Sequence, residues 1–254
     1  MRDIRNSVFY RDEWIWSNFV KYLVAKLNEY DSIENTLPSE FVFKESTYGS
    51  KKSKKNVQLF TWSVHNNRIK LARAVCIHSP TYSVLNFLII PDIIYNVPLF
   101  GVDFVTLPNF HLLVLDFQPS LSLEKQFDNY LLEKIINMRE SCHQIVPFAG
   151  EMPKEVDKFF SPGAIWSKLP KNTQSENLIS GQIYKSFTEY LNLYLQVLFK
   201  SKKVKSDLQD EIQKGQDSYL KYRKEKDPAR PMLTNLFGKP FTEELINNVL
   251  FSIR

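Results

Sequence analysis

YSVLNFLIIPDIIYNVPLFGVDFVTLPNFHLLVLDFQ, residues 82–118, contains three short runs of β-branched, aromatic and other apolar residues. The runs cover 82–91, 99–107 and 111–118, and the segments between them contain Pro and Asn, which favour turns. Short connections without an intervening helix indicate antiparallel neighbours. The stretch therefore predicts the centre of an antiparallel meander.

The segments on either side extend this pattern into a complete fold. Further β-rich runs lie at 40–46, 57–64 and 69–77, so the predicted sheet has about six strands. Apolar residues at helical spacing predict helices at 12–30, 122–142, 181–200, 206–226 and 242–251. One helix, a run of strands and then several helices predict an α/β fold: a three-layer α/β/α sandwich with an antiparallel sheet covered on both faces. No linker or repeat interrupts the pattern, so we predict one domain, residues 1–254.

The composition narrows the possible chemistry. Aromatic residues make up 14% of the 254 residues, enough to line a pocket for a flat conjugated ligand or to fill an aromatic core. Two cysteines and four histidines show no zinc or iron–sulfur spacing, so no metal site is predicted. Glycine-rich dinucleotide and phosphate motifs are also missing from the sequence. A redox enzyme with this sequence would take its electrons from outside.

The charge balance bears on partners and location. The net charge of +5 favours an acidic partner, and basic runs at 51–55 and 200–205 are either solvated loops or docking patches. No helix-turn-helix or aromatic RNA-binding motif accompanies them, so we expect an acidic protein rather than nucleic acid. The N-terminal segment lacks a signal-peptide pattern and no segment is long and apolar enough to span a membrane. We therefore expect a cytoplasmic protein that does not contact a membrane.

Two acidic residues stand in unusual places. Asp103 lies in the middle of an apolar strand, where burying a charged carboxylate costs several kcal/mol unless something nearby needs it. It either faces water or is held in a pocket as a proton donor. Asp227 precedes Pro228, which disfavours helix at Asp227 and predicts that the preceding helix ends there. Asp227 is either a helix-end acid paired with a neighbouring base or a second functional acid.

Four blocks resemble the ferredoxin-dependent bilin reductases, in order and over nearly the whole chain. They are VLNFLIIP (84–91), VPLFGVDFVTLPNFHLLVLDFQP (97–119), KFFSPGAIWSKLP (158–170) and KEKDPARPMLTNLFGKPFTEELINNVLF (224–251). The resemblance implies reduction of an open-chain tetrapyrrole by a radical mechanism, without a bound metal or flavin. Reduced ferredoxin supplies single electrons, and side chains or water supply protons. The blocks TYGSKKSK, IWSKLP and EKDPARPML are most similar to the branch that reduces the A-ring diene of 15,16-dihydrobiliverdin to phycoerythrobilin.

The resemblance also implies residue roles. Asp103 and Asp227 match the two aspartates that face the bilin from opposite sides, and both are expected to donate protons. Asn86 stands where the phycocyanobilin-forming branch has a histidine; it is either a hydrogen-bond partner of the bilin edge or a core amide. Lys168 aligns with a basic residue that binds a bilin propionate in relatives.

Other inferences are less specific. Arg230 and His111 are further candidates for substrate binding, although His111 is equally compatible with a surface strand position. The implied partners are ferredoxin and 15,16-dihydrobiliverdin, with a handover from the preceding bilin reductase left open. We expect a monomer in a cyanobacterium-like cytoplasm or a plastid stroma. Reduction of biliverdin to 15,16-dihydrobiliverdin, both steps in one protein, and a non-catalytic bilin carrier remain alternatives.

Overall fold

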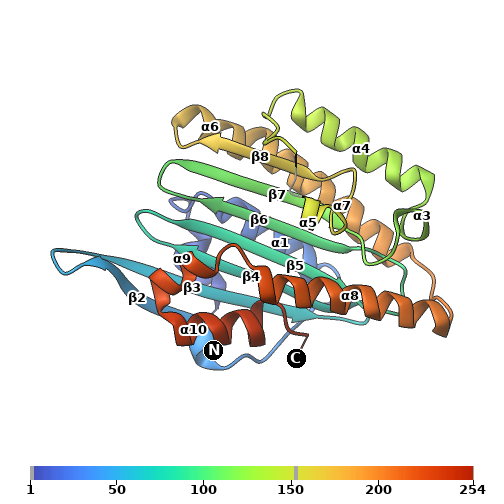
Figure 1. The fold of residues 1–254 in the computed structure, drawn as a ribbon, viewed down its shortest axis with the longest axis horizontal. Coiled ribbons are helices and arrows are strands. Elements are labelled where there is room, and N and C mark those ends of the chain that lie inside the picture. Colours follow the sequence, from blue (N-terminus) through green and yellow to red (C-terminus); the bar gives the residue numbers. More distant parts are fainter. Residues whose placement is uncertain (1–2, 152–153, 254) are drawn as a thin grey trace.

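Eight strands form one antiparallel sheet in the part of the chain that the computed structural model describes, residues 3–151 and 154–253 (Figure 1). Their order is β1-β3-β4-β5-β6-β7-β8, and β2 pairs with the other end of β3. The strands are β1 (Ile33–Glu34), β2 (Phe43–Ser50), β3 (Ser53–His65), β4 (Ile69–His78), β5 (Ser83–Pro91), β6 (Leu99–Thr106), β7 (Phe110–Gln118) and β8 (Ile165–Pro170).

The six predicted strands correspond to β2 through β7, and their meander order is confirmed. The predicted strand count is too low, because it omits β1 and β8. β1 has only two residues, too few for a periodic signal. β8 follows three helices rather than a short turn, so nothing local marks it as the neighbour of β7. It pairs with β7 from Leu115 opposite Ile165 to Phe110 opposite Pro170, and this pairing covers the edge of β7.

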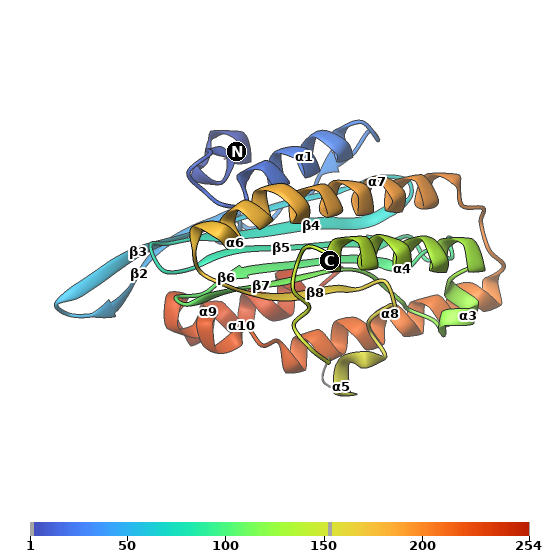
Figure 2. The same cartoon turned by 90° about the horizontal axis from the view of Figure 1, so that it is seen from above.

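Helices cover both faces of the sheet, which confirms the predicted three-layer architecture (Figure 2). One face carries α1 (Ser17–Asn28) and α7 (Tyr184–Lys200), with α4 (Asn129–His143) packed near β8. The other face carries α8 (Ser206–Lys226), α9 (Arg230–Phe237) and α10 (Lys239–Glu244). The other helices are short: 3₁₀ turns at Ile4–Asn6 and Val8–Tyr10, and α-helices α2 (Ser39–Val42), α3 (Leu123–Gln126), α5 (Lys154–Asp157) and α6 (Thr173–Leu178). π-helical turns at Ile179–Ile183 and Leu245–Leu250 precede α7 and follow α10.

Burial on both faces explains why the central strands are apolar almost throughout. In β5, Leu85, Phe87 and Ile89 pack in the core beneath α1 and α7. Val84, Leu88 and Ile90 alternate with them and pack in the core beneath α8 to α10. A strand with helices on both faces loses the apolar–polar alternation of a half-exposed strand. None of the described helices has the length and apolar character needed to cross a membrane.

Close approach of α8 to the loop after β7 depends on a glycine. A Cβ at Gly215 would lie 1.7 Å from the Ser120 carbonyl oxygen, so any larger residue has to push α8 away from the sheet. We expect Gly215→Ala to lower the free energy of unfolding by about 1–3 kcal/mol, the usual cost of overpacking. Gly181→Ala is a matched control, because a Cβ at Gly181 would meet no heavy atom within 4 Å. Urea unfolding that shows equal stabilities for the two variants would contradict the close approach.

Candidate active site

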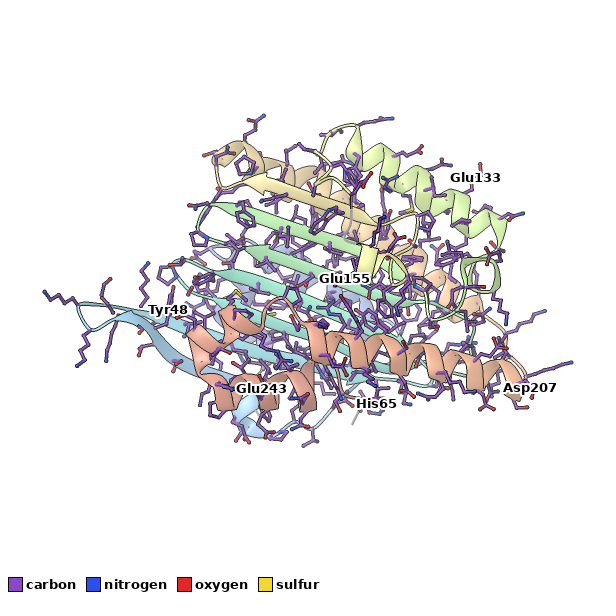
Figure 3. The ribbon with its side chains drawn as sticks, in the orientation of Figure 1. Tyr48, His65, Glu133, Glu155, Asp207 and Glu243 are labelled. Carbon is purple, nitrogen blue, oxygen red and sulfur yellow. The ribbon has the colours of Figure 1, made fainter. Side chains whose placement is uncertain are left out.

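A cavity of about 350 Å³ lies between the sheet and α8, within the range typical of small-molecule sites. Its floor is formed by β5, β6 and β7, and its opposite side by the last turns of α8. Residues of α5, including Glu155, also line it; Figure 3 shows Glu155 over the strands. Most of the lining is apolar or aromatic, including Leu88, Val102, Leu112, Val114, Phe159, Phe160, Trp166, Tyr219, Tyr222 and Phe251.

Strand register places Asp103 in this cavity. Asp103 lies opposite Asn86 of β5 and Val114 of β7, and all three line the cavity. The Asn86 amide nitrogen donates to Asp103 Oδ1 at 3.3 Å. Asp103 therefore does not point into open water: its side chain is 26% exposed, inside a largely apolar cavity.

The facing helix α8 brings a cation to this carboxylate. Arg223 Nη2 lies 3.6 Å from Asp103 Oδ2, and Arg223 Nη1 donates to the Tyr219 hydroxyl at 3.4 Å. The guanidinium also lies 4.7 Å from the centre of the Phe251 ring, a cation–π contact. Tyr219 and Arg223 are four residues apart in the helix, so they project from the same side of it. The cavity thus holds an acid, a cation and a phenol in one connected group.

Burial and charge together set the protonation of this group. Burial raises the pKa of Asp103 above its ordinary value; the nearby Arg223 charge opposes this rise and the Asp227 charge adds to it. Burial alone would lower the pKa of Arg223, but Tyr219, Asp227 and Asp103 raise it, so Arg223 stays protonated. Burial also raises the pKa of the Tyr219 hydroxyl. Asp103 is therefore a carboxyl group that holds its proton to a higher pH than an ordinary aspartate.

Asp227 lies at the end of α8, where the sequence predicted a helix stop, and this stop is confirmed. Its side chain is buried, and its Oδ1 accepts the Ala229 backbone N–H at 2.8 Å. Lys226 and Pro228, its neighbours in the chain, line the cavity, while Asp227 itself is not part of the lining. Its charge is nonetheless close enough to raise the pKa of Asp103.

The remaining predicted site residues lie outside the cavity lining. Lys168 pairs with cavity-lining Leu112 from the edge strand β8; it is exposed, with Nζ 4.4 Å from the centre of the Phe110 ring. Arg230, on α9, forms an ion pair with Glu243 and donates to the Lys224 carbonyl oxygen.

His111 does not line the cavity, so its predicted role in substrate binding is wrong. Its ring is fully buried on the opposite face of the sheet, where Nδ1 lies 2.9 Å from Thr106 Oγ1 and the ring packs against Trp16. Neighbouring residues of a strand point to opposite faces, so His111 faces away while Leu112 faces the cavity. It is neither a surface residue nor placed to contact a ligand in the cavity.

Arg223 and Tyr219 are the site residues that the sequence did not identify. Arg223 stood out only as one of several bases near Asp227, and the structure instead pairs it with Asp103 on a distant strand. The spacing of YLKYR indicates that the tyrosine and arginine share a helix face. No sequence signal says which strand that face meets.

The fold and cavity define a class of protein: a three-layer sandwich with a ligand-sized, largely apolar cavity that contains a carboxyl–guanidinium pair. A family model described as ferredoxin-dependent bilin reductase matches residues 20–252. The chain therefore belongs to the ferredoxin-dependent bilin reductase family, and it is an oxidoreductase.

Individual relatives agree with this assignment. The chain is 61% identical over 250 residues to the phycoerythrobilin:ferredoxin oxidoreductase of Prochlorococcus marinus strain MIT 9215, covering 98% of this chain and 99% of that protein. The protein of the same name from strain MIT 9211 is 40% identical, covering 95% and 94%. The fold is similar to the crystal structure of tomato phytochromobilin synthase in complex with biliverdin, with a TM-score of 0.78 and 21% identity over 94% of this chain and 83% of that one.

Proposed function

We propose that this enzyme reduces the A-ring diene of 15,16-dihydrobiliverdin to phycoerythrobilin. The reaction adds two electrons and two protons to the substrate and breaks no bond in its tetrapyrrole skeleton. Reduced ferredoxin supplies the electrons one at a time, so the reduction passes through a bilin radical that the first electron forms and the second electron removes, and it needs no cofactor bound to this chain. High identity to relatives named phycoerythrobilin:ferredoxin oxidoreductase supports this particular reduction.

The position of Asp103 is the main support for the proposed proton transfer. Its carboxyl group lies in the cavity lining, and burial raises its pKa toward the range of a general acid. After it gives up a proton, the carboxylate left behind is stabilised by Arg223 at 3.6 Å and by the Asn86 amide. The pair therefore suits a group that alternates between the acid and its anion.

Asp227 is the second proposed proton donor. Its chain neighbours Lys226 and Pro228 line the cavity, and its own side chain is buried next to them without being part of the lining. A proton delivered from this end of α8 and a proton delivered from the sheet floor would arrive at different parts of one flat ligand, which is how the scaffold would direct protons to different carbons. The propionates of the bilin need cations, and exposed Lys226 at the rim and Lys168 on the edge strand supply them.

An anaerobic assay that offers each bilin separately tests the proposed substrate. Reduced ferredoxin is added to the protein with 15,16-dihydrobiliverdin or with biliverdin, and absorption spectra follow the products. We expect turnover of 15,16-dihydrobiliverdin to phycoerythrobilin and little change in biliverdin. Consumption of biliverdin would instead support the earlier reduction step or both steps. Binding of either bilin without a colour change would indicate a carrier and refute the proposal.

A further inference from the structure

A second carboxyl group stands in a central strand, on the same face of the sheet as Asp103. Asp116 of β7 lies opposite Gly101 of β6, and Gly101 is two residues before Asp103 in the same strand. Unlike Asp103, it is completely buried and does not line the cavity. The proposed reaction gives it no role.

Both oxygens of the Asp116 carboxyl group accept hydrogen bonds from Ser161. Its Oδ2 accepts the Ser161 backbone N–H at 2.9 Å and its Oδ1 accepts the Ser161 hydroxyl at 2.5 Å. Burial raises the pKa of Asp116 to about 7, and the hydrogen bonds from Ser161 and from the Phe117 backbone N–H oppose this rise. A buried carboxyl group is costly to desolvate, and here both oxygens are used to hold a single position of another segment.

Ser161 comes directly after two residues that form one wall of the cavity. Phe159 and Phe160 precede Ser161 and both line the cavity. The Phe159 ring lies 5.7 Å from the ring of Tyr219 and 4.9 Å from that of Tyr222, centre to centre, so it packs against α8. Asp116 therefore connects the sheet to a wall that contacts the helix carrying Arg223.

We propose that Asp116 is a positioning residue for bilin reduction: its bonds to Ser161 hold the Phe159–Phe160 wall in the conformation that accepts the substrate. The inference rests on the proposed assignment of the cavity to the bilin. If the wall is in place in only a fraction of molecules, the apparent affinity for the bilin falls by that fraction. The chemical step at Asp103 is unaffected once the substrate is bound.

Two mild variants test this role. Ser161→Ala removes the hydroxyl and keeps the backbone N–H, and Asp116→Asn keeps the side-chain volume and one acceptor oxygen. We expect both to raise KM and the Kd for 15,16-dihydrobiliverdin by about five- to tenfold, as expected for loss of a charge-assisted hydrogen bond, with kcat changed less than about twofold. Absorption titration gives the Kd, and anaerobic kinetics with reduced ferredoxin give KM and kcat.

Ser167→Ala is the matched control. Ser167 is also buried, and its hydroxyl donates at 2.5 Å to the carbonyl oxygen of Pro147, in the segment between α4 and α5; neither residue lines the cavity. We expect it to lower the thermal midpoint as the test variants do, with KM, Kd and kcat unchanged. If Ser161→Ala and Asp116→Asn also lower only the thermal midpoint, the contact is merely structural and the inference is overturned.

A separate measurement tests whether the bilin binds in this cavity at all. Trp166 lines the cavity, so a bound bilin should quench its fluorescence, measured as the difference between the unaltered protein and Trp166→Phe. Quenching together with a raised KM in Ser161→Ala supports the positioning role. Quenching with an unchanged KM overturns that role alone. Bilin binding without quenching of Trp166 overturns both the assignment of the cavity and the role of Asp116.

Discussion

Asp103→Asn is expected to lose most of its bilin reduction while it still binds the bilin. An amide of the same shape keeps the contact with Asn86 and the cavity volume, but it has no acidic proton to give to a bilin radical. Removing a positioned general acid typically slows a reaction by about 10²- to 10⁴-fold. The measurement is the rate of phycoerythrobilin formation under anaerobic conditions, with bilin affinity from absorption titration.

A second aspartate controls for effects unrelated to the cavity. Asp217 lies on the exposed side of α8, where its Oδ1 accepts a hydrogen bond from Gln213. Asp217→Asn makes the same chemical change on the same helix as Arg223, and we expect it to leave both turnover and affinity unchanged. Full activity in Asp103→Asn would refute the assignment of Asp103 as a proton donor. Loss of bilin binding in that variant would make it a binding residue instead.

Arg223→Gln is expected to destabilise the protein more at neutral than at acidic pH. The change leaves two acids, half-buried Asp103 and buried Asp227, without the Arg223 cation that interacts with both of them. Removing one partner of a buried ion pair usually costs about 3–5 kcal/mol, and we expect about 3 kcal/mol because Arg223 and Asp103 keep partial exposure.

The pKa of Asp103 explains why the loss of stability in Arg223→Gln grows with pH. Its pKa in the folded protein is already above the ordinary value of 3.8, and loss of Arg223 raises it further because the Arg223 charge lowers it. When a carboxyl group has a raised pKa in the folded state, the protein loses free energy of unfolding as the pH rises from 3.8 through that raised pKa. The loss is larger in the variant than in the unaltered protein, because its Asp103 pKa is raised further. Urea unfolding at about pH 5 and about pH 8 measures this difference.

Arg230→Gln is the matched control for this prediction. Arg230 pairs with Glu243 near the surface, where ion pairs contribute little to stability. We expect its effect to be less than about 1 kcal/mol and nearly independent of pH over the same range. Equal losses in the two arginine variants would show that the Asp103–Arg223 pair has no special role in the folded state.

Much of the architecture is visible in local sequence patterns. The strands β2 to β7 can be recognised because their apolar runs are short and separated by turns, and α8 ends at Asp227 because Pro228 disfavours a further helical residue. β8 could not be predicted in this way, because the segment IWSKLP becomes a strand only by pairing with the edge of β7. An edge pairing across three intervening helices leaves no local signal.

Some residues of the candidate active site could also be recognised from the sequence, and others could not. The sequence alone marked Asp103, because a carboxylate in an apolar strand needs a physical reason to be there. It could not say that His111 faces away from the cavity, because a sheet buried on both faces has no apolar–polar alternation to reveal which residues share a face. The partners of the two strand acids, Arg223 for Asp103 and Ser161 for Asp116, come from segments distant in the chain. Only tertiary packing decides such pairs, since their attraction depends on separation in space and a sequence records separation along the chain.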